Sequence, residues 1–236
     1  MVEKLRLVSR ELVAEGTMAF HFEKPEGFEF RAGQAGDFIL VDPPESDDEG
    51  NTRAFSLVHA PHEGDLVVAT RLRDSAFKRV LRSMPIGSEV NFDGPWGDYT
   101  LHRRETTPAV FLIGGIGVTP VRSMISQATH DKTGHRLTLI HANDRAEAAP
   151  FVADFEHFAS VNPNFTYVQT LSNPPQDWPG ETGRIDEAML RRHVPDLEAP
   201  IFYLSGPAGM VKAMRTLLME AGADEDNIRT EEFSGY

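Results

Sequence analysis

One stretch, Ala-Val-Phe-Leu-Ile-Gly-Gly-Ile-Gly-Val-Thr-Pro at 109–120, constrains the fold more than any other part of the chain. Its opening apolar run is typical of a parallel strand that is buried on both faces. The glycines that follow let the backbone turn tightly and approach another group closely. We expect Thr119 to cap a helix that starts at Pro120. A strand, a glycine turn and a helix N-terminus in this order aim free N–H groups at one point, where a pyrophosphate fits.

This stretch departs from the dinucleotide-binding fingerprint in one place. Pro120 stands where a third glycine is expected. The alternative interpretation is a tight strand–helix connection of the kind found in any α/β protein. Other parts of the sequence are needed to choose between a nucleotide-binding turn and an ordinary strand–helix connection.

Composition excludes several classes of function. The chain has 236 residues, enough for two modest domains, and a net charge of −13, which argues against a nucleic-acid or anionic-membrane partner. No apolar stretch is long enough for a membrane span, so we expect no membrane insertion and a cytoplasmic location. The absence of cysteine excludes disulfides, a thiolate nucleophile and a cysteine-ligated iron–sulfur cluster. The nine histidines show no metal-binding spacing, and we expect no metal site.

The first half, 1–103, is predicted to be a small antiparallel barrel or sandwich. Met18, Phe20 and Phe22 alternate with polar or small residues, as in a half-buried strand. One helix is expected near Ser75–Ser83, and the acidic run Glu45–Glu49 is most simply a solvated loop. Turn signals separate the strands, which suits a barrel. The other strand candidates are Lys4–Val8, Asp37–Val41, Arg53–Val58, Asp65–Arg71 and Glu89–Phe92.

The second half, 104–236, alternates between strands and helices. Such alternation implies a Rossmann-like parallel sheet with helices on both faces and ligands at the carboxyl ends of the strands. One helix is marked by Phe151, Phe155 and Phe158, and another begins after Ser205-Gly206-Pro207 and runs to Gly222. The strand candidates are Ala109–Ile113, Leu137–His141, Phe165–Thr170, Ile201–Ser205 and a last one at Asn227–Thr230 or just beyond.

Two segments of the first half have residue types that are able to carry chemistry. Arg53-Ala54-Phe55-Ser56 presents a guanidinium, an aromatic ring and a hydroxyl on one strand. The segment from Arg71 to Phe77 is a strand end that runs into a helix start with basic side chains beside it, a second plausible phosphate site. Taken singly, each segment also fits an edge strand or a capped surface helix.

In combination, these motifs resemble those of the ferredoxin–NADP⁺ reductase superfamily. Arg-x-Phe-Ser comes first, Gly-Gly-x-Gly-x-x-Pro and Gly-Pro-x-x-Met follow, and the chain ends in Glu-Glu-Phe-Ser-Gly-Tyr. The resemblance covers nearly the whole chain in the order of the family. It implies a barrel that binds FAD, a second domain that binds NAD(P)H, and passage of a hydride from the nicotinamide to flavin N5.

For the flavin, the resemblance implies that Arg53 pairs with the FAD pyrophosphate and that Phe55, often Tyr in the family, stacks on the flavin or lines its pocket. Ser56 lies near flavin N5, and Tyr236 covers the flavin. Ser56 and Glu231 are the candidates for tuning and proton delivery. The second phosphate-binding segment corresponds to Ser75, Ala76 and Phe77.

For the nicotinamide nucleotide, the resemblance implies a binding loop and a motif beside the nicotinamide ring. Ser205 replaces the usual cysteine of that motif. The loop comprises Gly115, Gly117, Val118, Thr119 and Pro120, and the motif comprises Ser205, Gly206, Pro207 and Met210. Related sequences often have a basic residue at the position of Asp144. A carboxylate there accepts hydrogen bonds from ribose hydroxyls and repels a 2′-phosphate, so NADH is favoured over NADPH. Arg145 beside it is able to turn toward that phosphate.

The leading hypothesis is therefore an FAD-dependent NAD(P)H oxidoreductase that passes electrons to a separate acceptor. That acceptor is a ferredoxin-like protein, a haem protein, or a small molecule such as free flavin or a quinone. Lys78, Arg79 and Arg82 either dock an acidic partner or form a solvated basic face. The alternative function is a non-catalytic nucleotide-binding or regulatory subunit that retains the fold.

Overall fold

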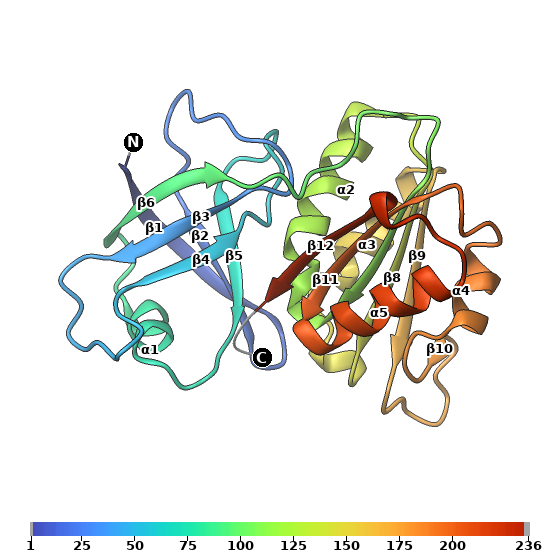
Figure 1. The fold of residues 1–236 in the computed structure, drawn as a ribbon. Helices are drawn as coiled ribbons and strands as arrows, with labels where there is room; N and C mark the ends of the chain where they lie inside the picture. Colours follow the sequence, from blue (N-terminus) through green and yellow to red (C-terminus); the bar gives the residue numbers. More distant parts are fainter. Residues whose placement is uncertain (1, 234–236) are drawn as a thin grey trace.

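The structure, a computed structural model, describes residues 2–233 as two halves that lie side by side, each built on a six-stranded sheet (Figure 1). In the first half the strand order is β4-β3-β6-β1-β2-β5, and all paired strands are antiparallel. The edge strands β4 and β5 come close together, so the predicted antiparallel barrel is confirmed. The strands are β1 (Val2–Ala14), β2 (Thr17–Phe22), β3 (Ala35–Leu40), β4 (Thr52–Ser56), β5 (Leu66–Arg71) and β6 (Glu89–Trp96).

The barrel core follows from the alternation seen in the sequence. Phe20 and Phe22 on β2 are fully buried and pack with Phe38 and Phe92 in one apolar cluster. The predicted helix is α1 (Ala76–Ser83), and Ser75 is its N-cap, because its hydroxyl accepts the backbone N–H of Lys78. The apolar face of α1 closes the barrel.

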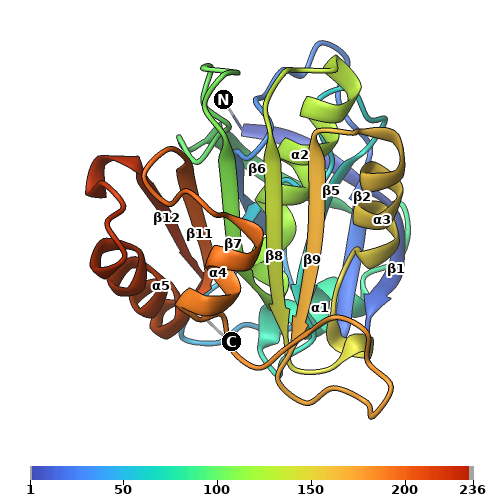
Figure 2. The same ribbon diagram turned by 90° about the vertical axis from the view of Figure 1, so that its right-hand side faces the viewer.

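The second half has a parallel sheet with the order β10-β9-β8-β7-β11-β12, which confirms the predicted α/β architecture. Figure 2 shows helices on both faces of the sheet, α2 and α3 on one and α4 and α5 on the other. None of the helices in residues 2–233 combines the length and apolar character that a bilayer span requires. The elements are β7 (Ala109–Gly114), α2 (Thr119–Asp131), β8 (Leu137–Asn143), α3 (Val152–Val161), β9 (Phe165–Leu171), β10 (Glu181–Thr182), α4 (Glu187–His193), β11 (Ile201–Pro207), α5 (Ala208–Glu220) and β12 (Ile228–Phe233).

The stretch at 109–120 forms the predicted strand, turn and helix, but its helix start differs in detail. A 3₁₀ turn, Gly115–Val118, lies between β7 and α2, and Val118 is the N-cap in place of Thr119. The Thr119 hydroxyl donates back to the carbonyl of Ile116 over 3.2 Å. The extra turn brings the backbone close to β11, so that a Cβ on Gly117 would lie 2.7 Å from the nitrogen of Gly206. Glycine is therefore required at 117.

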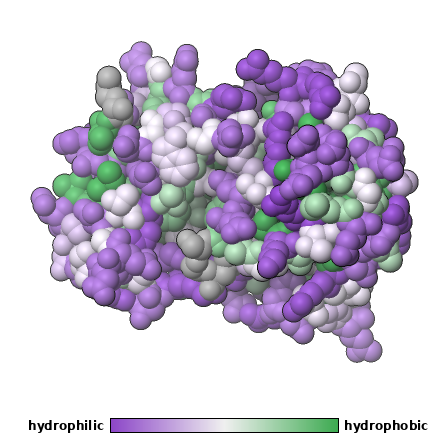
Figure 3. All heavy atoms as spheres, in the orientation of Figure 1, coloured by the Kyte–Doolittle hydropathy of each residue, from purple (hydrophilic) through white to green (hydrophobic). Residues whose placement is uncertain are grey.

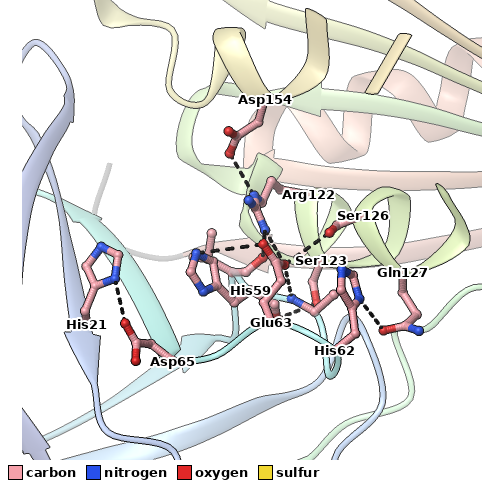
Figure 4. A network of polar contacts seen from close by, with 12 residues as sticks. His21, His59, His62, Glu63, Asp65, Arg122, Ser123, Ser126, Gln127 and Asp154 are labelled. Carbon is pink, nitrogen blue, oxygen red and sulfur yellow. Dashed lines mark hydrogen bonds and ion pairs between the residues drawn. The ribbon is translucent and has the colours of Figure 1, made fainter. Parts of the chain in front are cut away.

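A buried ionic network joins the two halves (Figure 4). Arg122 on α2 donates from Nη1 to Glu63, in the β4–β5 connection, over 2.5 Å and from Nε to Asp154 on α3 over 2.9 Å. Its side chain is only 8% exposed. Ser126 also donates to Glu63, and Ser123 donates to the carbonyl of His59. Helix α2, which directly follows the glycine turn, thus carries the contacts that hold the barrel against the second half. The predicted boundary at 103/104 lies between β6 and β7 and stays a prediction.

Candidate functional site

Two cavities lie along the edge where the parallel strands end, and one of them reaches into the barrel. The barrel-side cavity has a volume of about 390 Å³. In the view of Figure 3 the surface is hollowed between the two halves, and paler, more apolar side chains lie between hydrophilic ones. The cavity is lined by Glu49, Arg53, Ala54, Phe55, Ser56, Ala69, Thr70, Arg71, Arg73, Asp74, Ser75, Lys78, Ile116, Thr119 and Phe233.

All of Arg-Ala-Phe-Ser lines the barrel-side cavity, as the resemblance implies. Arg53 lies over the ring of Phe77, with its Cζ 5.3 Å from the ring centroid. Phe55 packs edge-on against Phe38 at 5.8 Å between centroids and so is fixed by the core below. Ser56 is 5% exposed, at the deep end of the strand. This strand therefore offers one cation, one aromatic face and one hydroxyl to the same cavity.

The second predicted phosphate segment is split between the cavity and the core. Ser75 lines the cavity, whereas Ala76 and Phe77 are buried at 2% and 1% exposure and point into the barrel core. Any contact of these two residues with a ligand is thus limited to the backbone. The N–H of Ala76 already has an acceptor, the Oδ2 of Asp47 at 2.9 Å.

The acidic run 45–49 is exposed to solvent at Glu45, Asp48 and Glu49, as expected of a solvated loop, but it also makes ion pairs with nearby basic groups. Glu45 pairs with Arg79 over 2.6 Å, and Glu49 pairs with Arg53 over 2.8 Å. Asp47 accepts from both Arg53 and the start of α1. The hydrogen bond from Ala76 is the main cause that lowers the pKa of Asp47. The loop between β3 and β4 is thus held against the basic groups by these contacts.

The second cavity lies outside the carboxyl ends of β7, β8 and β11 and has a volume of about 770 Å³. Arg71 lines both cavities, and its Nε is buried without a hydrogen-bond partner in residues 2–233. Asn143, at the end of β8, likewise has a buried amide whose oxygen and nitrogen both lack a partner in that range. The cavity is lined by Arg71, Gly114, Gly115, Ala142, Asn143, Asp144, Ser172, Arg184, Ile185, Pro207, Gly209, Met210, Ala213, Met214 and Leu217.

Several residues of the predicted nicotinamide loop lie behind the cavities and do not line them. Gly117, Val118 and Pro120 are buried, and so are Ser205 and Gly206. The Ser205 hydroxyl donates to the carbonyl of Gly117 over 2.6 Å and so ties β11 to the glycine turn. The serine that replaces the usual cysteine thus has a structural partner within the fold.

His141 supports the glycine turn from below, a role that the sequence did not indicate. It is fully buried at the end of β8, and its Nε2 lies 2.9 Å from the carbonyl oxygen of Gly115. Burial lowers the pKa of His141 to about 4, so the ring is neutral and Nε2 donates. This hydrogen bond fixes the carbonyl of Gly115, whose φ of +51° favours glycine.

Glu231, on β12, is a half-buried acidic residue whose side chain forms no ion pair within residues 2–233. Its Oε2 is buried and has no hydrogen-bond partner within residues 2–233. Burial, together with the charge of Asp98, raises the pKa of Glu231 to about 7. The neighbouring Phe233 lines the barrel-side cavity, while Tyr236 lies outside the described residues. Glu231 is thus able to hold or release a proton near neutral pH.

At the end of β8, Asp144 lines the second cavity and accepts a hydrogen bond from the amide of Asn173. Arg145 does not line it and pairs instead with Glu15 at the tip of the β1–β2 hairpin, over 3.2 Å. A different cation, Arg184, lines the cavity from the segment between β10 and α4. Arg184 belongs to no strand-end motif, which is why the sequence did not indicate it.

Similarity to known proteins extends over most of the chain. Residues 111–216 match the family described as oxidoreductase NAD-binding domain. The chain is 29% identical over 235 residues to one of the subunits of Na(+)-translocating NADH-quinone reductase from Idiomarina loihiensis, and the match covers 91% of this chain and 57% of that protein. It is 24% identical to reductase component 1 of terephthalate 1,2-dioxygenase from a Comamonas species, covering 85% and 59%. The chain thus spans somewhat more than half the length of these relatives.

Solved structures with the same fold cover the chain almost completely. The flavohem-like FAD/NAD-binding domain of nitric oxide dioxygenase from Vibrio cholerae superimposes with a TM-score of 0.84 at 18% identity, covering 98% of each chain. A ferredoxin NADP⁺ reductase from Neisseria gonorrhoeae, with bound FAD and NADP, gives 0.81 at 20% identity and the same coverage. At these low sequence identities, the structural similarity shows a shared fold and nothing further.

Proposed function

We propose that this chain, which has the fold of the ferredoxin–NADP⁺ reductase superfamily and an oxidoreductase NAD-binding domain, is a flavin-dependent NAD(P)H oxidoreductase. The predicted resemblance to that superfamily is confirmed by the family match and by the structural likeness. The barrel-side cavity is the proposed site of FAD, and the cavity at the strand ends is the proposed site of the nicotinamide nucleotide.

The observation that carries the proposal is that the two cavities meet at one side chain and one loop. Arg71 lines both, while Gly115 lines one cavity and the adjacent Ile116 lines the other. Hydride transfer needs a donor and an acceptor held within roughly 3–3.5 Å. Two nucleotide sites that meet at the same residues allow this approach, whereas two separate pockets would not.

The residues of the barrel-side cavity fit FAD in charge and shape. The buried Nε of Arg71 is a donor that finds no acceptor among residues 2–233, a costly arrangement that a phosphate oxygen would resolve. Arg53, Arg73 and Lys78 line the same cavity. Phe55 supplies an aromatic face, and Ser56 a hydroxyl at the deep end. FAD, when bound, supplies the redox chemistry, and the protein supplies binding, orientation and a proton.

The residues of this chain divide the remaining tasks. Arg53 and Arg71 bind phosphate, and Ser56 offers a hydrogen bond at the reacting end of the cavity. His141 and Ser205 hold the glycine turn in place through the carbonyls of Gly115 and Gly117. Glu231 is the proposed proton donor, because its carboxyl has a pKa of about 7.

For the acceptor, we propose a separate protein or small molecule that takes electrons from the reduced flavin. Two relatives support this class, since one is named as part of an NADH-quinone reductase and another as a dioxygenase reductase component. The chain has no cysteine and therefore no cysteine-ligated iron–sulfur cluster of its own. A quinone, a ferredoxin-like protein and a haem protein are the acceptors to screen.

The test is anaerobic reduction of the purified protein. We expect it to contain FAD and to lose its flavin absorbance when NADH is added. Turnover with ferricyanide, quinones and ferredoxin-like proteins then ranks the acceptors. A protein that binds FAD and NADH but stays oxidised is the alternative, a regulatory nucleotide-binding subunit. A protein that binds no flavin contradicts the proposal.

Replacing Glu231 with glutamine is expected to flatten the pH profile of flavin reduction. In the wild type the carboxyl loses its proton as the pH rises through about 7, so the rate should fall across that range. Glutamine cannot titrate, and the profile should become level. Stopped-flow bleaching by saturating NADH gives the rates, and Glu232→Gln on the exposed face of the same strand is the control. An unchanged profile in Glu231→Gln removes this residue from the reaction.

Replacing Asp144 with alanine is expected to raise the kcat/KM for NADPH relative to NADH by about tenfold, or about 1.4 kcal/mol. The change removes a carboxylate that repels the 2′-phosphate, while Arg184 on the same cavity wall is retained. Steady-state kinetics with both coenzymes is the measurement. Asp177→Ala, an exposed acid outside the cavity, is the control. A wild-type preference for NADPH, or an unmoved ratio in Asp144→Ala, contradicts the assignment.

A further inference from the structure

One carboxylate of the chain bonds to two groups beside the barrel-side cavity that suit phosphate binding, a guanidinium and the first N–H of a helix. The Oδ2 of Asp47 accepts the N–H of Ala76, at the start of α1, over 2.9 Å. Its Oδ1 accepts from Nη2 of Arg53, on β4, over 3.3 Å. A guanidinium and a helix N-terminal N–H that converge on one anion form an arrangement that binds phosphate. Asp47 therefore bonds as a phosphate group would.

The loop that carries Asp47 is fastened to the same elements by exposed contacts. Glu49 pairs with Arg53, and Glu45 pairs with Arg79 on α1. Both acids have side chains at least 42% exposed, so water competes for each pair and each is individually weak. The loop is thus held in a defined position by bonds that a stronger ligand is able to replace.

The charge balance around the cavity favours an acidic side chain beside it. Arg53, Arg73 and Lys78 line the cavity together, and burial and then the two guanidinium groups lower the pKa of Lys78. Like charges gathered in a partly buried cavity repel one another unless anions lie among them. Glu49 and Asp74 line the cavity, and Asp47, next to the lining residues, adds a further negative charge through its pair with Arg53. A diphosphate would bring equivalent charge to the same donors.

We propose that Asp47 is an internal substitute for a cofactor phosphate, which closes the phosphate site of the cofactor-free chain and is displaced when the flavin dinucleotide binds. This inference rests on the proposed function, because the displacing ligand is the FAD of that function. Two consequences follow. Competition by Asp47 weakens the affinity for FAD, and the loop at 41–51 becomes freer when FAD is bound.

A fluorescence titration tests the first consequence. Flavin is removed from the purified protein, and quenching of added FAD is measured for wild type, Asp47→Asn and Asp48→Asn. Asp48 is an exposed acid of the same loop with no ion pair in the described part of the chain. Asp48→Asn therefore removes the same negative charge as Asp47→Asn but none of the contacts of Asp47. We expect Asp47→Asn to bind FAD about tenfold more tightly and Asp48→Asn to equal the wild type.

Equal or weaker binding by Asp47→Asn overturns the inference and shows that Asp47 is a permanent part of the site. That result leaves the proposed function intact, because FAD is still bound. An absence of FAD binding in all three proteins overturns the proposed function and the inference with it.

Limited proteolysis of the wild type tests the second consequence without a variant. A protease that cuts after glutamate has sites at Glu45 and Glu49 in the loop. We expect FAD to accelerate cleavage at these two bonds, which is monitored by the masses of the fragments. We expect Asp47→Asn to be cleaved quickly even without FAD. Protection of the two bonds by FAD overturns the inference.

Discussion

Replacing Arg122 with methionine is expected to lower the free energy of unfolding by about 3 kcal/mol, the lower end of the range for breaking a buried ion pair from one side. Methionine keeps most of the aliphatic length but leaves Glu63 and Asp154 without their shared cation. Asp154 is 39% exposed and rehydrates, whereas Glu63 is 20% exposed and cannot do so fully. Urea denaturation followed by circular dichroism gives the value.

The dependence of the free energy of unfolding on pH, in the acidic range, should also change in Arg122→Met. Burial alone would raise the pKa of Glu63, but the hydrogen bond and charge of Arg122 outweigh it and lower that pKa below 4.5. The stability that Glu63 contributes is therefore present above its unfolded pKa and is lost as the pH falls through the lower folded value. Arg122→Met should lose this dependence.

Lys4→Met, which breaks an exposed pair with Glu89, is the control and should lower the free energy of unfolding by at most about 1 kcal/mol. A small effect of Arg122→Met shows that the two halves are held together by apolar contacts.

The elements of the fold could be predicted because their signals are local. An apolar run or an alternating pattern fixes which side chains face the core, so every predicted strand is present, with its ends moved by a few residues. Strand β1 continues to Ala14 through exposed polar positions, because its hydrogen bonding to β2 does not depend on apolar side chains. β10 was missed, since two residues, Glu181 and Thr182, give no pattern to read.

The site was predictable only where a residue belongs to a motif. Arg53 to Ser56 line the cavity as expected. Arg184 reaches the second cavity from a segment that carries no matching signal, and the motifs did not indicate that Ile116 and Asn143 line the cavities. Their positions depend on how loops and helices from distant parts of the chain cross.

Asp47 is another residue whose contacts could not be predicted from the sequence. Its run of acids is what a solvated loop looks like in sequence, and only the path of the loop brings it onto Arg53 and α1. A hydrogen bond between residues 47 and 76 depends on a close approach that no local pattern encodes. His141 is a comparable case, because its role depends on the glycine carbonyl that the 3₁₀ turn places above it.

Replacing Arg53 with alanine is expected to weaken FAD binding by about ten- to a hundredfold, or about 1.5–3 kcal/mol, the worth of a charge-assisted contact in a partly desolvated site. The Arg53 side chain is 18% exposed and is held over Phe77, so its guanidinium is already oriented before a ligand arrives. Its Nη1 also donates to the carbonyls of Glu49 and Thr52, and the variant should loosen the acidic loop as well. Fluorescence titration of the flavin-free protein is the measurement.

Two further variants separate the loss of a phosphate contact from a general loss of positive charge. Arg82→Ala removes a cation from the exposed face of α1 and should leave FAD affinity unchanged. In the double variant Arg53→Ala with Asp47→Asn, the gain from Asp47→Asn should shrink, because one of the two donors that Asp47 occupies is gone. Wild-type affinity in Arg53→Ala would mean that the phosphate is bound elsewhere in the cavity, by Arg71 and Arg73. Full additivity of the two changes would mean that Asp47 acts through α1 alone.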